Sequence, residues 1–183
     1  MRIIAGTLRS RRLQSPSGLA TRPTLDQTRE SLFNILQNRV AGARVLDLFA
    51  GSGALGLEAL SRGADSAVFC DSSREAARCV RQNIEALGLD QQARLLQMDW
   101  SRALETLSAE GEQFDLIFLD PPYDLSLDGV LSAIAQQGLL AQEGLITAEH
   151  DRRQAITLPA GLERYRQKDY RGTQIDFIRW EAS

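Results

Sequence analysis

The stretch Val45-Leu-Asp-Leu-Phe-Ala-Gly51-Ser-Gly53-Ala-Leu-Gly56 decides the fold, because an apolar strand breaks there into a glycine turn and then into a helix. Glycine lets a backbone approach a ligand closely, and the N-terminus of the following helix presents free N–H groups. The spacing matches G-x-G-x-x-G, and Asp71 follows Gly51 by 20 residues, where an acid binds a ribose in dinucleotide folds. A tight turn without a ligand is the weaker interpretation, since it leaves these glycines and acids as a coincidence.

The glycine turn does not decide between NAD and S-adenosylmethionine as the ligand. Asp47, at the end of the strand, favours S-adenosylmethionine, because its carboxylate suits an ammonium group and would repel a pyrophosphate. An NAD oxidoreductase is also disfavoured because one nucleotide-binding fold uses nearly all of the 183 residues and leaves no substrate domain.

Strand and helix patterns alternate on both sides of this turn, which predicts an α/β protein with a parallel sheet and crossover helices. The expected strands are 45–49, 67–71, 94–98, 114–119, 145–149, 162–168 and 173–180, and the expected helices are 24–39, 54–62, 72–87 and 127–137. Thr24 and Ser72 are the expected helix caps, each followed three residues later by Gln or Glu. Residues 2–14 are typical of a small strand or hairpin.

The fourth expected strand leads directly into Asp120-Pro121-Pro122-Tyr123. In a doubly wound sheet ordered 3-2-1-4-5, strands 1 and 4 are neighbours and ligands bind beyond their carboxyl ends. We therefore expect the glycine turn and Asp120 to face one crevice. The two prolines hold Asp120 and the nearby carbonyls as stiff acceptors, and Tyr123 offers a flat face for stacking.

Length and composition predict one globular domain. With 43% hydrophobic and 25% charged residues, the chain is unlike collagen, a coiled coil or a disordered protein. No apolar run approaches the roughly 18 residues of a membrane span, and the N-terminus lacks a signal-peptide core, so we expect a cytoplasmic protein. Cys70, Cys79 and His150 are too few for a Cys/His zinc site, no metal is expected, and all three are expected to be structural.

Charge is segregated along the chain although the formal net charge is only −3. Residues 1–39 hold seven arginines against two acids, residues 90–151 hold twelve acids against two arginines, and residues 152–183 hold seven basic residues against four acids. Because arginine suits phosphate groups, this predicts an anionic partner at one edge. The candidate contacts to RNA phosphates are Arg9, Arg11, Arg12 and Arg22.

Two motifs together resemble one enzyme family. Asp120-Pro-Pro-Tyr resembles the (D/N)PPY motif of amino-group methyltransferases, and the glycine turn resembles their cofactor motif. The opening is similar to the N-terminal signature of the bacterial RsmD-type 16S rRNA guanine-N2 methyltransferases, on Arg2-Ile-Ile-Ala-Gly, Thr21-Arg-Pro-Thr24 and Arg29-Glu-Ser-Leu-Phe-Asn-Ile-Leu36. The resemblance covers nearly the whole chain, most specifically residues 2–64 and 114–123.

The resemblance implies a Rossmann-like class I methyltransferase fold. We expect a mostly parallel seven-stranded sheet in the order 3-2-1-4-5-7-6, with helices on both faces and a small N-terminal hairpin and helix. A single domain, residues 1–183, would comprise a basic arm and helix (1–39) and a catalytic core (40–183). The implied reaction is methyl transfer from S-adenosyl-L-methionine to the N2 amine of a guanine in 16S rRNA, within an assembled or assembling 30S particle and by a monomer.

The two motifs and the resemblance together imply the site residues. Asp120 and the Pro121 carbonyl are expected to accept the two N–H bonds of the target amine, with Pro122 stiffening the turn and Tyr123 stacking on the base. The expected cofactor contacts are Asp47 to the ammonium, the backbone of Gly51, Ser52 and Gly53, Asp71 and Ser72 at the ribose, Asp99 at the adenine amine, and Phe49 and Trp100 at the border. Two alternatives stay open: an adenine-N6 methyltransferase on RNA or DNA, and a non-catalytic RNA-binding protein with a relic cofactor fold.

Overall fold

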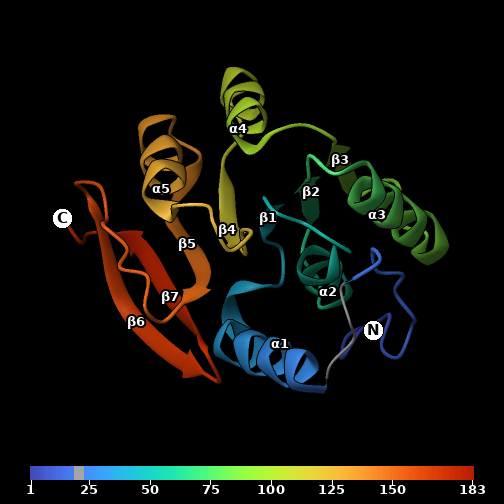
Figure 1. Ribbon diagram of the computed structural model, residues 1–183. Helices are drawn as coiled ribbons and strands as arrows, with labels where there is room; N and C mark the ends of the chain where they lie inside the picture. The colour runs from blue at the N-terminus through green and yellow to red at the C-terminus, as the bar shows by residue number, and fades with distance from the viewer. Residues whose placement is uncertain (19–22) are drawn as a thin grey trace.

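The computed structural model describes residues 1–18 and 23–183, with only the backbone of residues 23 and 24. Its strands form a seven-stranded sheet in the order β3-β2-β1-β4-β5-β7-β6, as the resemblance implied (Figure 1). β1 to β5 run parallel, whereas β7 is antiparallel to both β5 and β6. In chain order the elements are α1 (Pro23–Ile35), the 3₁₀ helix η1 (Gln37–Arg39), β1 (Arg44–Asp47), α2 (Ala54–Ser61), β2 (Ser66–Cys70), α3 (Arg74–Leu87), β3 (Ala93–Leu96), α4 (Trp100–Ala109), β4 (Phe114–Leu119), α5 (Leu127–Gln136), β5 (Leu140–Asp151), β6 (Leu162–Tyr170) and β7 (Thr173–Trp180).

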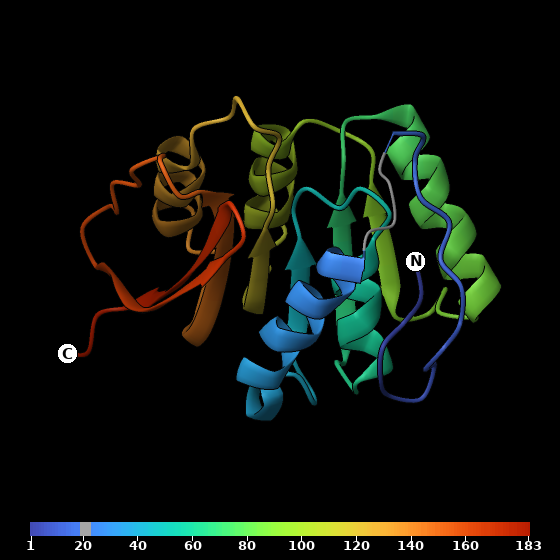
Figure 2. The same cartoon turned by 60° about the horizontal axis from the view of Figure 1, so that its bottom comes forward.

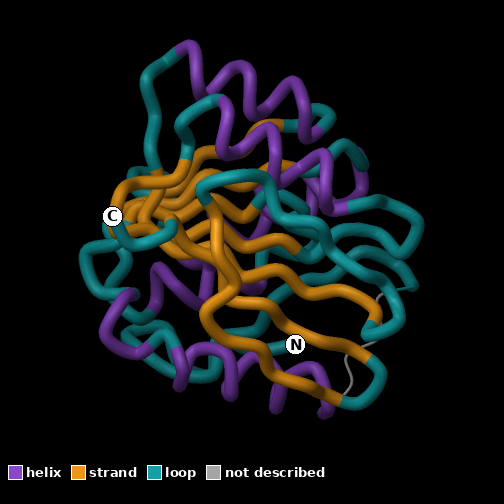
Figure 3. Tube along the Cα trace, turned by 90° about the vertical axis from the view of Figure 1, so that its left-hand side faces the viewer, coloured by secondary structure: helices purple, strands orange, loops and turns teal. Residues whose placement is uncertain are grey.

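Helices cover both faces of the sheet, because the central strands are apolar on both sides. Five of the six β4 residues are buried, the pattern of a parallel strand between two layers. One core joins α1, α2 and α3 to the sheet through residues such as Phe33, Leu57 and Phe69, and the other joins α4 and α5 to its opposite face. Figure 3 shows helices on both sides of the strands.

Several boundaries differ from the sequence-based expectations. Helix α4 lies between β3 and β4, where no helix was predicted, and β5 begins at Leu140, before the expected residue 145, with a register irregularity against β4. Helix α3 is capped by Ser73, whose Oγ accepts from Ala76 N, and not by Ser72. Helix α1 begins at Pro23, so Thr24 lies inside it. These shifts move element ends by a few residues and leave the order of the sheet unchanged.

The N-terminal arm, defined as residues 1–18, folds back on itself and runs alongside α3 (Figure 2). The expected hairpin is reduced to a single antiparallel bridge between Arg2 and Arg12. Asn83 of α3 ties down the arm near its end, accepting from Gln14 N at 2.8 Å and donating to the Gln14 carbonyl at 2.9 Å. The arm is therefore packed onto the domain.

A buried carboxylate on α2 anchors the start of the arm. Glu58 is fully buried and accepts hydrogen bonds from Ile4 N at 2.8 Å and Ala5 N at 3.1 Å. Two arginines flank it, Arg62 at 3.1 Å and Arg29 of α1 at 3.7 Å. Because a buried carboxylate needs such partners, this cluster joins the arm, α1 and α2 into one unit.

Other sequence-based expectations concern single residues. Cys70 and Cys79 are buried free thiols, and the His150 ring is buried with Nε2 3.1 Å from Asp176 Oδ2. In the part of the chain that the structure describes, no helix is long and apolar enough to span a membrane.

The glycine at position 56 leaves room for the α2–β2 contact, which gives a test of the packing. A Cβ added to Gly56 would lie 2.4 Å from Cε1 of the fully buried Phe69, whereas a Cβ added to Gly129 in α5 would have no neighbour within 4 Å. We expect Gly56→Ala to lower the free energy of unfolding by about 1–3 kcal/mol, and Gly129→Ala to raise it by up to about 1 kcal/mol. Urea unfolding measures both, and equal effects would contradict this packing.

Candidate active site

A cavity of about 710 Å³ lies at the carboxyl ends of β1 and β4, where the doubly wound order predicted a crevice. Its volume is within the range of sites for small ligands and cofactors. The sequence-predicted residues that line it are Asp47, Phe49, Gly51, Ser52, Asp71, Ser72, Asp99, Trp100, Asp120, Pro121 and Pro122. The two motifs, more than 60 positions apart in the chain, thus meet at one site.

The glycine turn is held from the neighbouring strand. Asp71, which follows β2, accepts from Gly51 N at 2.9 Å through Oδ2 and from Ser73 N at 2.9 Å through Oδ1. The Ser52 carbonyl accepts from Asn83 of α3. These bonds fix the turn so that the backbone from Ala50 to Ser52 faces the cavity.

Gly53 is a correction to the expected set of cofactor contacts. It does not line the cavity, and its backbone has a φ of +82°, the left-handed region that favours glycine. A Cβ added there would meet Leu57, Phe69 and Val80 at 3.3–3.4 Å. Gly53 is therefore placed in the turn into α2, behind the residues that line the cavity.

Asp47 is a desolvated carboxyl at the wall of the cavity. It is 3% exposed, and its Oδ2 accepts from Gly56 N at 3.0 Å. Burial raises the pKa of Asp47 to about 8, and the nearby acids Asp120 and Asp71 add to this increase. A cation bound in the cavity would favour the ionised form and lower this pKa.

A second carboxyl beside Asp120 was missed by the sequence analysis. Leu119 of β4 pairs with Ala148 of β5, so the next residues, Asp120 and Glu149, lie on adjacent parallel strands, and both line the cavity. Asp120 is exposed by its surface area and Glu149 is half-buried, but protein surrounds both carboxyls; this desolvation raises the pKa of Asp120 to about 6 and that of Glu149 to about 8, the latter helped by repulsion from Asp120. An acid at the end of the strand after the Asp-Pro-Pro-Tyr strand is the sequence signal that could have indicated it.

The wall formed by these residues consists of acceptors. Among the described residues, none donates a hydrogen bond to the Asp120 carboxyl, the Glu149 carboxyl or the Pro121 carbonyl. The Pro122 carbonyl is used internally, accepting from Leu125 N at 3.1 Å. A ligand that presents several N–H groups would satisfy this wall.

Tyr123 and Asp99 differ in part from their expected positions. Tyr123 is 77% exposed, does not line the cavity, and donates from its hydroxyl to Asp151 Oδ2 at 3.0 Å. Asp99 lines the cavity but also caps α4, and its hydrogen bonds from Ser101 hold its pKa below the usual range.

The arginines expected to contact RNA do not gather at this cavity. Arg11 donates to the carbonyl of Ala86 near the end of α3, and the arm beside Arg9 is bonded to Ser61, the last residue of α2. Arg12 forms the backbone bridge with Arg2, and Arg22 lies outside the described residues. Since α2 and α3 begin at the cavity and run back along the sheet, Arg9 and Arg11 lie at its opposite edge.

The raised pKa of Asp47 predicts a pH dependence of stability. The folded protein retains the Asp47 proton up to about pH 8, whereas the unfolded chain loses it near the ordinary pKa of 3.8, so this group makes the free energy of unfolding fall as the pH rises between these values. We expect Asp47→Asn to reduce that slope by up to about 1.4 kcal/mol per pH unit. Urea unfolding from pH 5 to 8 tests this, with exposed Asp65→Asn as the control; an unchanged slope in Asp47→Asn would refute it.

Comparisons with known proteins agree with the motifs. The family model "Conserved hypothetical protein 95" matches residues 1–179. "Putative rRNA methyltransferase YlbH" of Bacillus subtilis strain 168 is 42% identical over 83% of this chain and 83% of its own length. "Ribosomal RNA small subunit methyltransferase D" of Escherichia coli strain K12 is 37% identical over 92% of this chain and 84% of its own length. The solved structure "Putative methyltransferase yhhF from Escherichia coli" has a TM-score of 0.86 and 35% identity, over 100% of this chain and 99% of that one. The chain therefore belongs to the family that this model and these rRNA methyltransferases represent, which is the family that its Asp-Pro-Pro-Tyr and N-terminal motifs resemble.

Proposed function

We propose that this protein transfers a methyl group from S-adenosylmethionine to the exocyclic N2 amine of a guanine in 16S rRNA. The observation that carries the proposal is the acceptor wall of Asp120, Pro121 and Glu149, which faces the same cavity as the glycine turn. The names of two relatives, an rRNA methyltransferase and a ribosomal RNA small subunit methyltransferase, agree with it.

The residues of the cavity fit S-adenosylmethionine. Asp47 is a buried carboxyl whose raised pKa marks a place for a cationic group such as the methionine ammonium. Asp71 and Ser72 follow β2, where ribose hydroxyls are bound in this class of sheet, and Phe49 and Trp100 supply apolar surface. When bound, S-adenosylmethionine supplies an electrophilic methyl group on a sulfonium.

The amine of a purine is a poor nucleophile, because its lone pair is delocalised into the ring. Asp120 and the Pro121 carbonyl accept its two N–H bonds, which draws the nitrogen towards tetrahedral geometry and directs its lone pair along the line of transfer. Such orientation lowers the activation free energy by several kcal/mol, up to about 7–11 in ideal cases. With the cofactor bound, its S–C bond would break as the N–C bond forms, and the proton lost from nitrogen would pass to Asp120, whose pKa of about 6 leaves it mostly ionised near neutral pH.

Glu149 favours guanine over adenine as the target. Guanine carries an N1–H donor beside its N2 amine, whereas adenine has an acceptor nitrogen beside its N6 amine. An ionised Glu149, next to Asp120, accepts from the guanine N1–H, and this contact favours the ionised form of a carboxyl whose pKa is otherwise raised to about 8. Tyr123, exposed at the rim, stacks on the flipped base if its loop turns inward, a contact worth about 1–3 kcal/mol.

Removing the Asp120 carboxyl separates catalysis from cofactor binding. We expect Asp120→Ala to reduce methyl transfer to RNA at least about 100-fold, since the amine is neither oriented nor deprotonated, while S-adenosylmethionine still binds in calorimetry. Asp124→Ala changes an exposed acid that does not line the cavity and is the matched control. Retained turnover in Asp120→Ala would exclude the proposed role, and a wild-type protein without affinity for S-adenosylmethionine would favour the non-catalytic alternative.

The modified base is identified by mass analysis of nucleosides after reaction with free 16S rRNA and with 30S particles. We expect N2-methylguanosine, because the acceptor wall matches the donors of the guanine edge. N6-methyladenosine as the product would contradict the assignment to guanine and support the adenine alternative. A stronger reaction on 30S particles than on free rRNA would agree with a substrate that includes ribosomal proteins, and the reverse result would contradict it.

A further inference from the structure

The outer end of the sheet carries a cationic face that the proposed reaction does not use. β6 is an edge strand, and Tyr165, Arg166 and Lys168 are exposed along it, with Arg171 exposed at the turn into β7. Arg166 pairs with Phe177 and Lys168 with Ile175, so both cations point to the face covered elsewhere by α1. These four residues are called the hairpin face below.

The cations of the hairpin face have no anionic partner among the residues that the structure describes. Elsewhere in residues 152–183 the arginines are paired: Arg153 with Asp151, Arg164 with Asp176, Arg179 with Glu163 and, more loosely, Arg152 with Asp169. Within the described parts of the chain, Arg166, Lys168 and Arg171 form no ion pair; Arg166 lies over the Phe177 ring at 5.9 Å. Cations on an edge strand also hinder pairing with a second sheet, but that role does not require them on one face.

The register connects the hairpin face to the cavity. Glu149 of β5 pairs with Ile175 of β7, and Ile175 pairs with Lys168 of β6. Glu149 and Ile175 both line the cavity, and Lys168 is the next residue across the sheet in this row of paired residues. At about 4.8 Å between strands, the Lys168 backbone is roughly 10 Å from that of Glu149, and Arg166 lies about 7 Å from Lys168 along β6.

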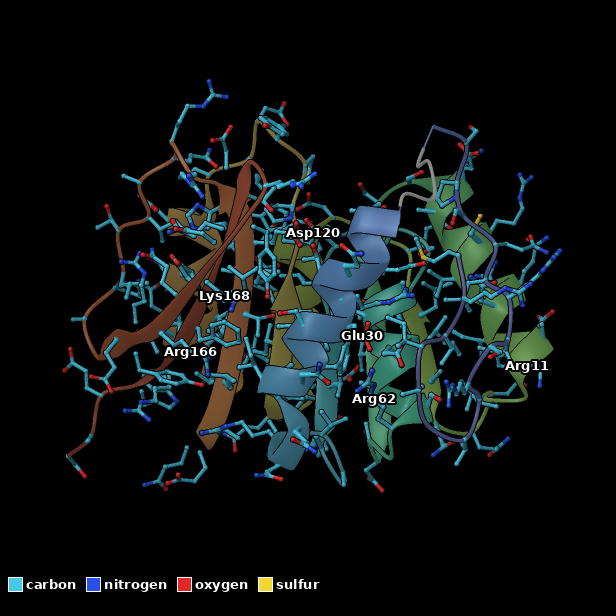
Figure 4. The ribbon with its side chains drawn as sticks, turned by 90° about the horizontal axis from the view of Figure 1, so that it is seen from below. Arg11, Glu30, Arg62, Asp120, Arg166 and Lys168 are labelled. Carbon is cyan, nitrogen blue, oxygen red and sulfur yellow. The ribbon has the colours of Figure 1, made fainter. Side chains whose placement is uncertain are left out.

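A contact to α1 fixes the position of the hairpin. The hydroxyl of Tyr170, near the hairpin turn, is 2.8 Å from Ser31 Oγ of α1. Figure 4 shows Arg166 and Lys168 on one side of α1 and Arg11 of the arm on the other, beyond α2 and beside α3. The cations of the hairpin face and those of the arm therefore lie on different sides of the molecule.

We propose that the hairpin face binds the phosphate backbone of the RNA whose target base enters the cavity; this inference rests on the proposed function. A nucleotide with its base beside Asp120 and Glu149 leaves its phosphates at the rim, where the acids of the cavity repel them. Lys168 is a cation without an ion pair among the described residues and lies near that rim, and Arg166 precedes it on β6, further from the carboxyl edge. Tyr165, 37% exposed and covered on one side by Arg179 at 4.5 Å, offers a ring edge beside them for a neighbouring base.

The test compares two double variants that each remove two positive charges. Arg166→Gln/Lys168→Gln alters the hairpin face, and Arg9→Gln/Arg11→Gln alters the arm at the opposite edge. Binding of 16S rRNA and of 30S particles is measured without cofactor as a function of salt. For two lost contacts to single-stranded RNA, the slope of log K against log salt falls by about 1.4, which is roughly 25-fold in affinity between 1 M and 0.1 M salt.

We expect this loss in the hairpin variant and a smaller one in the arm variant. Arg166→Lys/Lys168→Arg should restore binding, because phosphate contact needs the charge, whereas lost packing on Phe177 would not be restored by it. Urea unfolding and calorimetry with S-adenosylmethionine verify that the variants keep the fold and the cavity. An equal or larger loss in the arm variant, an unchanged salt slope in the hairpin variant, or a wild-type protein that binds no RNA would overturn the inference. Wild-type protein that binds RNA through the hairpin face but does not methylate it would overturn the proposed function alone.

Discussion

The structure depends on the hydrogen bonds that two carboxylates make to the turn between β1 and α2. Asp47, the last residue of β1, accepts from Gly56 N, and Asp71, just after the neighbouring β2, accepts from Gly51 N. Parallel pairing brings these two strand ends to one edge, so the turn is held from two strands at once. Because Gly56 also packs against Phe69, the same few residues determine where α2 begins and where the cavity lies.

The second constraint is Glu58, which makes the N-terminal arm part of the cavity wall. Its buried carboxylate takes two N–H groups of the arm and contacts Arg29 of α1, and both Met1 and Arg29 line the cavity. Leaving that carboxylate without partners would cost several kcal/mol, so release of the arm would lower the stability of the fold substantially. The basic charge of residues 1–39, which the sequence analysis assigned to an anionic partner, therefore serves packing in part: Arg29 of α1 belongs to this cluster, and Arg11 of the arm bonds to α3.

Local sequence patterns predicted the fold and the two motifs of the cavity, because each of these patterns depends on residues that are close together in the chain. The alternation of strands and helices, the glycine turn and the Asp120 motif each depend on neighbours in the chain, and the structure brings both motifs to one cavity. Glu149 could not be recognised in this way, since its partner Asp120 is defined by the β4–β5 register. The cap of α3 shows a smaller limit: Ser72 and Ser73 both suit an N-cap, and only the geometry selects Ser73. Gly53 matched a binding motif but serves the turn.

The arrangement of charge in space explains why a net charge of −3 says little about an RNA substrate. At physiological salt, charges are screened beyond about 8 Å, so a phosphate responds to the nearest groups and not to the sum over the chain. Asp47, Asp120 and Glu149 line the cavity as acceptors, and a cationic cofactor or the N–H groups of a base would favour their ionised forms. Arg166 and Lys168, two strands away on the same face, supply the opposite sign outside it. Under the proposed function, a nucleotide satisfies both regions with its base inward and its backbone outward, so the separation of charge favours the orientation that brings the amine to the cavity.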